Sequence, residues 1–405
     1  MTPRPDNKAN KVFGPESALI RLIGGHIFLH ASMAGMRMAA PLLVLRENFS
    51  PLAVGVLLAL FSLAQLFLAL PAGRYADRHG LRRPVGISVC LATSGAVLAL
   101  FFPIFEVLCL SALLSGGATG AASIALQRHV GRAAHDATEL KRLFSWLSLG
   151  PALANFVGPF VAGLLIDGVG SWLGGYGIER PGFRAAFFLM AIFPLICWGL
   201  VRTTHELASE GTAQLPGQRR IWDLVRTPMM GRLLLVNWLL ASCWDVHTFI
   251  VPVLGHERGF SASVIGTLLG SFALSAAFIR VIMPMVAAHL RERMVVTAAM
   301  LLTAATLVIY PLMGSALLMG LCSVVLGMAL GSVQPMIMTM LHQITPRDRH
   351  GEALGLRVMS LNGSSVFMPM LFGLLGAAVG VPVVFWMVGA TVGAGARIAW
   401  GLRSG

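Results

Sequence analysis

The chain has 405 residues, of which 56% are hydrophobic and only 12% are charged, and its mean hydropathy is +0.78. A water-soluble domain of this length needs a far more charged surface, so this composition excludes a soluble globular protein. The net charge of +13 would suggest nucleic-acid binding in a soluble protein, but here membrane topology explains it better, and we expect no nucleic-acid partner.

Apolar runs of about 20 residues recur along the whole chain, which predicts an all-α polytopic membrane protein with twelve transmembrane helices. The first 15 residues are polar and no cleavable signal peptide is expected before the first run. The expected spans are 18–45, 51–72, 84–104, 107–128, 143–167, 183–202, 233–254, 262–286, 293–313, 315–340, 353–378 and 381–401.

The longest polar stretch separates the sixth and seventh spans and predicts a division into two halves. The expected parts are a cytoplasmic tail (1–17), a six-helix bundle (18–202), a cytoplasmic linker (203–232), a second six-helix bundle (233–401) and a short tail (402–405).

The positive charges predict the orientation. Of the 30 lysines and arginines, 24 fall in the N-terminal tail, every second loop, the C-terminal tail or the span ends next to them. Both termini should therefore be cytoplasmic, in a bacterial-type inner (plasma) membrane, and we expect a monomer in the lipid bilayer. The five cysteines lie within apolar runs in no paired spacing, which is typical of buried thiols and not of disulfides.

An internal repeat supports the two halves. With an offset of 211, residues 41–67 align with residues 252–278 without a gap, and ten of these 27 positions are identical, including Pro41/Pro252, Phe49/Phe260, Ser50/Ser261 and Gly55/Gly266. The halves are therefore expected to be duplicated, pseudo-symmetric bundles, an architecture that places its substrate between them near the membrane midplane.

The loop between the second and third spans, GRYADRHGLRRP, resembles the signature loop of the major facilitator superfamily. The residues that match are Gly73, Asp77, Arg78, Gly80, Arg82 and Arg83. The resemblance covers the whole chain and implies a transporter in which this loop acts as a cytoplasmic gating latch. Asp77 at a helix end can accept hydrogen bonds in one state and release them in another, although the arginines could also be topology anchors.

The fifth span carries GPFVAG, which resembles the motif associated with the drug:proton antiporters of this superfamily. Gly158, Pro159 and Gly163 match, and small residues there allow close helix packing, by itself or in the service of export. The fourth-span arginine that such antiporters usually carry is replaced here by Ala112 or Leu113, which draws attention to the other charges inside the membrane.

Those charges lie on related stripes of two helices. His26, His30 and Arg37 share one face of the first span, and the offset of 211 places Asn237 and Asp245 on the equivalent face of the seventh span. Asp245 should therefore face His30 and Arg37, either as a coupling or substrate-contacting carboxylate or as a static ion-pair partner of Arg37 or Arg280.

His247 points away from that stripe, because two residues along a helix turn the side chain by about 200°. It is at least as well explained as a packing histidine. Arg280 in the eighth span could bind an anionic substrate or pair with Asp245. The expected cavity-lining residues, each of which could instead make a helix–helix hydrogen bond, are His26, Met33, Gln65, Asn155, Asn237 and Gln334.

The leading hypothesis is a secondary transporter that works by alternating access and exports an amphipathic or hydrophobic small molecule in exchange for protons. One alternative is a transporter of a small organic anion bound by Arg37 and Arg280. Another is a copper transporter that uses His30, Met33, Cys243 and His247. A non-transporting sensor on the same fold is a third. The sequence shows no catalytic constellation or nucleotide-binding loop, and we expect no enzyme activity, no cofactor and no resident metal.

Overall fold

The computed structural model describes residues 15–133, 137–173, 180–204, 206, 224, 226–287, 291–345 and 350–402. The expected N-terminal tail and linker lie largely outside the described residues. Within them, regular structure is helical throughout. The helices of the first half are α1 (Pro15–Arg46), α2 (Pro51–His79), α3 (Arg82–Phe101), α4 (Phe105–Ala133), α5 (Ala137–Leu173) and α6 (Arg180–Val201).

The second half consists of α8 (Pro228–Glu257), α9 (Ala262–Ala287), α10 (Glu292–Ile309), the short 3₁₀ helix η1 (Tyr310–Leu312), α11 (Ala316–Ile344), α12 (His350–Val379) and α13 (Val381–Trp400). Twelve of the described helices are long and apolar enough to cross a membrane, and each contains one of the predicted spans or most of it. The prediction of twelve transmembrane helices is confirmed.

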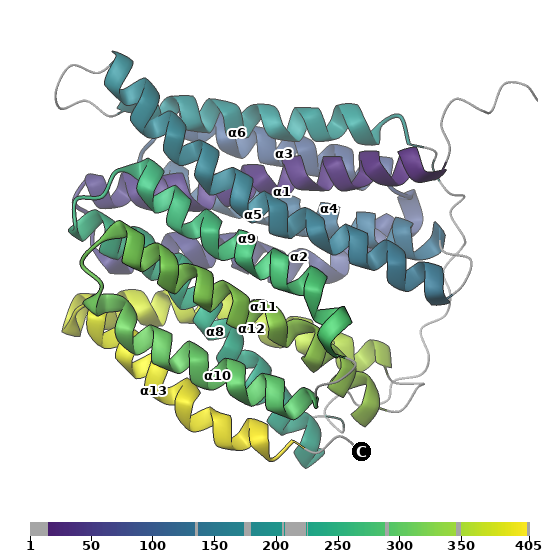
Figure 1. The fold of residues 1–405 in the computed structure, drawn as a ribbon. Coiled ribbons are helices and arrows are strands. Elements are labelled where there is room, and N and C mark those ends of the chain that lie inside the picture. The colour runs from purple at the N-terminus through teal and green to yellow at the C-terminus, as the bar shows by residue number, and fades with distance from the viewer. Residues whose placement is uncertain are drawn as a thin grey trace, which may run out of the picture.

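The helices form two bundles that lie side by side. Figure 1 shows α1–α6 on one side and α8–α13 on the other, with α5 and α9 adjacent where the bundles meet. The second contact between bundles is made by α2 and α12. We call the end of the molecule where α1 begins and α13 ends the proximal end, on the right in Figure 1, and the opposite end the distal end.

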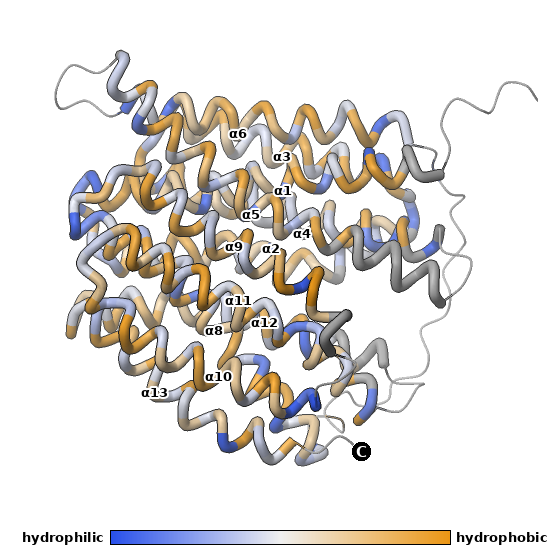
Figure 2. The backbone as a smooth tube through the Cα atoms, viewed as in Figure 1, coloured by the Kyte–Doolittle hydropathy of each residue, from blue (hydrophilic) through white to orange (hydrophobic). Residues whose placement is uncertain are grey.

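Hydropathy follows the long axis of the bundles. Figure 2 shows hydrophilic residues gathered toward the two ends and a mostly hydrophobic middle. Many large apolar side chains in that middle are exposed, such as Phe67 and Phe367, each about 70% accessible. Exposed apolar side chains on a helical bundle are what a lipid-facing surface requires, because lipid is as apolar as the protein interior.

The sequence repeat corresponds to a repeat in local structure. Ser50 precedes α2 and accepts a hydrogen bond from the Ala53 N–H at 3.4 Å, and Ser261 precedes α9 and accepts one from the Val264 N–H at 3.4 Å. Serine is a preferred N-cap because its hydroxyl satisfies an unpaired backbone donor of the first turn. The matched serines therefore begin equivalent helices in the two bundles.

Matched glycines make equivalent close contacts. A Cβ atom on Gly116 would lie 2.0 Å from the Phe61 carbonyl oxygen, and one on Gly327 would lie 2.3 Å from the Phe272 carbonyl oxygen. Both pairs differ by 211 residues, so α2 approaches α4 as α9 approaches α11. The approach is possible because glycine has no side chain between the two backbones.

Candidate functional site: a charged cavity between the two bundles

The structure joins the bundles by an ion pair near the middle of the molecule. Arg37 of α1 lies with its Nη2 atom 3.9 Å from the Asp245 Oδ1 atom of α8, and the Asp245 side chain is only 3% exposed. The offset argument predicted that Asp245 faces Arg37, and the contact is present. A buried carboxylate is tolerated in such an environment when a cation and hydrogen-bond donors face it.

Two serines of α12 supply those donors. The Ser364 hydroxyl donates to Asp245 Oδ2 at 2.8 Å, and the Ser365 hydroxyl donates to Asp245 Oδ1 at 2.9 Å. Asp245 is thus held by its own bundle through two hydrogen bonds and by the other bundle through Arg37. Sequence reasoning missed both serines, because they lie 119 and 120 residues from Asp245 and belong to no motif.

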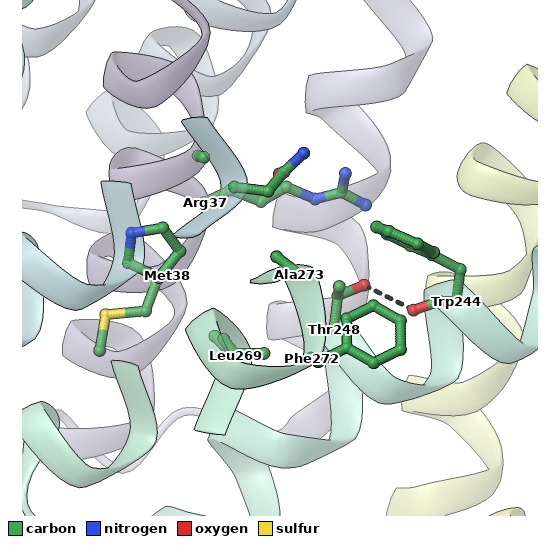
Figure 3. A pocket seen from close by; sticks show the side chains of 10 residues that line it. Arg37, Met38, Trp244, Thr248, Leu269, Phe272 and Ala273 are labelled. Carbon is green, nitrogen blue, oxygen red and sulfur yellow. Dashed lines mark hydrogen bonds between the residues drawn. The ribbon is translucent and has the colours of Figure 1, made fainter. Parts of the chain in front are cut away.

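Arg37 also lines a pocket that both bundles form. Figure 3 shows its side chain extending from α1 with the guanidinium group on the side where Trp244 and Thr248 of α8 lie. The Arg37 Nε and Nη2 atoms are buried and have no hydrogen-bond partner. The remaining lining residues are Ala34, Met38, Asn155, Pro159, Leu269, Phe272 and Ala273.

A second cavity adjoins this pocket, since Asn155 and Trp244 line both. We call it the Arg280 cavity. Its volume is about 200 Å³. Asp245, Ser365, Gln334 and Arg280 are among its lining residues, together with Pro151, Ala152, Leu240, Ala241, Leu330, Val333 and Leu361.

Arg280 does not pair with Asp245. Its guanidinium carbon lies 5.7 Å from the centre of the Trp244 ring, a cation–π arrangement, and its buried Nε atom has no hydrogen-bond partner. Of the two ion-pair partners considered for Asp245, the structure selects Arg37 and leaves Arg280 on the cavity wall.

Arg357 is one of the 24 positive charges on the expected cytoplasmic side and lies near the start of the expected span 353–378. The structure places it inside α12, where its Nη2 atom donates a hydrogen bond to the Gln334 Oε1 atom. Its Nε atom is buried without a partner. A second arginine therefore contacts a residue that lines the Arg280 cavity, and no sequence motif marks it.

The histidines of α1 lie within the first bundle instead of on Asp245. The His26 Nε2 atom lies 3.0 Å from the Ser123 hydroxyl, and the His30 Nε2 atom lies 3.4 Å from the Asn155 amide nitrogen. Among the described residues, the polar contacts of Asp245 are with Arg37, Ser364 and Ser365 and not with His30. The expected contact between His30 and Asp245 is therefore not made in this state.

Three other residues expected to line the cavity make contacts elsewhere or none. The Gln65 amide nitrogen lies 3.4 Å from the Met33 sulfur, between α2 and α1. Asn237 is buried, and neither side-chain polar atom has a hydrogen-bond partner. Of the six expected lining residues, Asn155 and Gln334 are those found in the walls of these two cavities.

His247 is a packing histidine in this structure. It is fully buried, its ring stacks on Phe272 with centroids 4.1 Å apart, and its Nε2 atom lies 2.9 Å from the Ser323 hydroxyl. Cys243 donates to the Leu239 carbonyl oxygen at 3.3 Å within the same helix. His30, Cys243 and His247 thus have separate partners, which disfavours the copper site that the sequence allowed.

The export-associated motif of α5 lies at the contact between the bundles. A Cβ atom on Gly163 would be 2.4 Å from the Ala262 carbonyl oxygen of α9, and one on Gly266 would be 2.4 Å from the Pro159 carbonyl oxygen. Gly158 faces α1 of its own bundle, near the Ala31 carbonyl oxygen. The motif residues therefore permit close backbone approach, both within the first bundle and across the distal half of the interface.

Asp167 strengthens that distal contact. Its carboxylate accepts hydrogen bonds from the backbone N–H groups of Ala262 (3.0 Å) and Ser263 (2.6 Å) in the first turn of α9. A carboxylate at this position satisfies unpaired donors and interacts favourably with the positive end of the helix dipole. The sequence placed Asp167 only near a helix end and did not predict this link.

The signature loop is tied to the start of the linker. Gly80 has φ of +74°, a conformation that favours glycine, and it ends α2. The Glu206 carboxylate accepts from the Leu81 N–H (2.8 Å) and the Arg82 N–H (3.2 Å) where α3 begins. The Arg82 side chain donates to the Thr204 carbonyl oxygen at 2.8 Å. Glu206 was not predicted, because no motif marks it.

The other residues of the loop complete α2 and α3. Gly73 and Arg78 lie in the last part of α2, and Arg83 lies in the first turn of α3. The side chain of Asp77 lies outside the described residues, so its predicted role as a latch stays a prediction.

Twelve membrane-crossing helices in two repeated bundles, with cavities lined by both, define a membrane transport protein. A sequence model of the Major Facilitator Superfamily matches residues 22–243 and 233–404. The chain belongs to this superfamily, as its signature loop indicated.

The chain is also similar to individual proteins, and the solved structures among them share its fold. The chain is 28% identical over 290 residues to the class E tetracycline resistance protein of Escherichia coli, covering 68% of this chain and 67% of that protein. A solved structure of a POT family transporter in complex with 5-aminolevulinic acid matches with a TM-score of 0.78 at 14% identity, covering 94% of each chain. A bacterial homologue of the human lysosomal transporter Spinster, solved in an inward-facing, unoccupied conformation, matches with a TM-score of 0.73 at 15% identity, covering 96% of this chain and 94% of that chain.

Proposed function

We propose that this chain is a proton-coupled secondary transporter that exports an amphipathic small molecule by alternating access. The observation that carries the proposal is the carboxylate of Asp245, which faces the Arg280 cavity and is paired across the bundle interface with Arg37. The similarity to a tetracycline resistance protein supports export of a drug-like compound.

The geometry around Asp245 suggests how a proton could act. An ionised carboxylate attracts Arg37, whereas a protonated carboxyl group loses most of that attraction. Serine hydroxyls can donate or accept, but a guanidinium group can only donate. Protonated Asp245 can therefore keep its hydrogen bonds to Ser364 and Ser365 while its link to Arg37 weakens. Protonation would thus loosen the contact between bundles and leave the second bundle intact.

We assign the proximal end to the cytoplasm, because 24 of the 30 lysines and arginines were expected on that side and positive charge is retained there. The close glycine contacts and the Asp167 link lie in the distal half of the interface. In this orientation the outer side is closed and the structure corresponds to an inward-facing state, in a plasma membrane of bacterial type.

The test is transport in proteoliposomes that contain the purified protein and are driven by an imposed pH gradient. Tetracycline is the first compound to examine, followed by a panel of amphipathic drugs. The Asp245→Asn variant should lose gradient-driven flux while retaining its thermal unfolding temperature. Glu106→Gln, which removes an exposed carboxylate at the distal end, is the matched control and should transport normally. Unchanged flux in Asp245→Asn would refute the role of this residue.

A further inference from the structure

We infer that the Arg280 cavity contains a recognition site for the carboxylate group of an aromatic substrate, built from Arg280, Trp244 and the Arg357–Gln334 pair. This inference rests on the proposed transport function and names the class of substrate. It adds Arg357, which contacts the cavity wall through Gln334, and assigns recognition of the substrate's charge to the second bundle.

The first argument is charge. The cavity is lined by one carboxylate, that of Asp245, which already has Arg37 and two serine hydroxyls as partners. Arg280 lines the same cavity, and Arg357 donates a hydrogen bond to Gln334, which also lines it. Neither arginine forms an ion pair with a carboxylate among the residues that the structure describes. The cavity therefore has an excess of positive charge that an anion would neutralise.

The second argument is hydrogen bonding. The Nε atoms of Arg280 and Arg357 are buried and unpartnered. A buried donor without a partner costs about 1–3 kcal/mol, so it is retained where a ligand can satisfy it. An arginine that only anchored the topology would extend to the lipid headgroups. These two side chains instead contact Trp244 and Gln334, which line the cavity.

The third argument is position along the helices. Arg280 lies seven residues before the end of α9, and Arg357 lies seven residues after the start of α12, which places both about 10 Å from the proximal helix ends. Asp245 lies 17 residues into α8, about 25 Å from that end. A substrate that enters from the proximal side would meet the two arginines before it reaches Asp245.

The fourth argument concerns the body of the substrate. Trp244 lines both cavities and contacts Phe272 edge to face, with ring centroids 4.5 Å apart. The Arg280 cavity has further apolar walls from Leu330 and Leu361. An aromatic ring can pack against these groups and Trp244 while its carboxylate reaches Arg280, because all of them line the same cavity.

The repeat shows that this site belongs to one bundle. The positions equivalent to Arg280 and Arg357 in the first bundle are Ala69 and Leu147, by offsets of 211 and 210. The two arginines are therefore not inherited features of both halves, and the asymmetry fits a role in binding one end of a substrate.

The test is isothermal titration calorimetry on the purified full-length protein with three compounds of one shape: 1-naphthoate, its uncharged amide 1-naphthamide, and the cation 1-naphthylmethylammonium. We expect the carboxylate to bind at least tenfold more tightly than either of the others. A preference for the amide or the amine, or binding of none of the three, would overturn the inference.

Variants locate the site. Arg280→Gln and Arg357→Gln should each weaken naphthoate binding at least tenfold, and Arg280→Lys should retain part of it because the positive charge remains. Arg226→Gln removes an exposed arginine outside the cavity and should bind as the parent does. Equal naphthoate affinity in the parent and Arg280→Gln, with both folded by thermal unfolding, would overturn the assignment.

The binding measurement needs no pH gradient and is therefore separate from the test of Asp245. Gradient-driven flux that depends on Asp245 in a protein that prefers the amine would refute the carboxylate site and leave the proposed coupling standing. The opposite result is a carboxylate preference that depends on Arg280 together with flux that is unchanged in Asp245→Asn. It would support the carboxylate site and refute the proposed coupling role of Asp245.

Discussion

Replacing Asp167 with alanine should shift the transporter toward a state that is open at the distal end. The Asp167 carboxylate belongs to α5, and its two acceptor bonds go to the Ala262 and Ser263 N–H groups of α9 in the other bundle. If the bundles separate at this end during alternating access, these two bonds exist only in the closed arrangement. Asp167→Ala therefore destabilises one state and leaves the other unaffected.

The size of the shift follows from the type of bond. Hydrogen bonds to a charged group contribute about 1.5–3 kcal/mol each, but Asp167 is only half-buried and water can replace part of the loss. Loss of a helix N-cap costs about 0.5–2 kcal/mol. A value of about 2 kcal/mol corresponds to a roughly 30-fold change in the ratio of the two states. A distal-open population of about 1% would then rise to about a quarter.

Pulsed electron paramagnetic resonance can measure this change. Glu106 and Leu317 are exposed at the distal ends of α4 and α11, one in each bundle, and they are equivalent under the repeat. Spin labels on Glu106→Cys and Leu317→Cys, in a background without the five native cysteines, report the distance between the bundles. Asp167→Ala should add a population at longer distance.

The control is Glu47→Gln. Glu47 also lies at the distal end, but its ion pair with Arg180, at 3.5 Å, stays within the first bundle. It should leave the distance distribution unchanged. An unaltered distribution in folded Asp167→Ala, or an equal change in Glu47→Gln, would show that the Asp167 bonds do not select the state.

Two further predictions concern a close backbone contact between the bundles and the hydrogen bonds that Glu206 accepts. Gly266→Ala places a Cβ atom 2.4 Å from the Pro159 carbonyl oxygen, so it should also disfavour the distal-closed state, by about 1–3 kcal/mol. In the same spin-label assay the control Gly168→Ala should have no effect, because its Cβ atom meets nothing within 4 Å. Glu206→Ala should expose the Leu81 and Arg82 amides, and hydrogen exchange of a peptide covering them should accelerate while peptides from α4 are unchanged. Equal exchange in the parent and the variant would mean that the Glu206 link does not persist in solution.

Much of the fold could be predicted from the sequence, because its signals are local. The twelve spans follow from apolar runs, since every backbone polar group in lipid must be paired within a helix. The two bundles follow from the repeat, whose matched Ser50 and Ser261 begin equivalent helices. The contact between Asp245 and Arg37 could also be predicted. The repeat identifies which residues of the first and seventh spans are equivalent, and therefore which faces of these two helices meet.

Only the tertiary structure shows the hydrogen-bond partners that are far apart in the sequence and are not related by the repeat. Ser364 and Ser365 hold Asp245 from 119 and 120 residues away, Gln334 receives Arg357 from another helix, and Glu206 caps a helix that begins more than 120 residues earlier. A polar residue inside an apolar run gives the same sequence pattern whether its side chain lines a cavity or makes a hydrogen bond to a neighbouring helix. The rotation and tilt of the packed helices separate these cases, and they depend on all the side chains at each helix interface together.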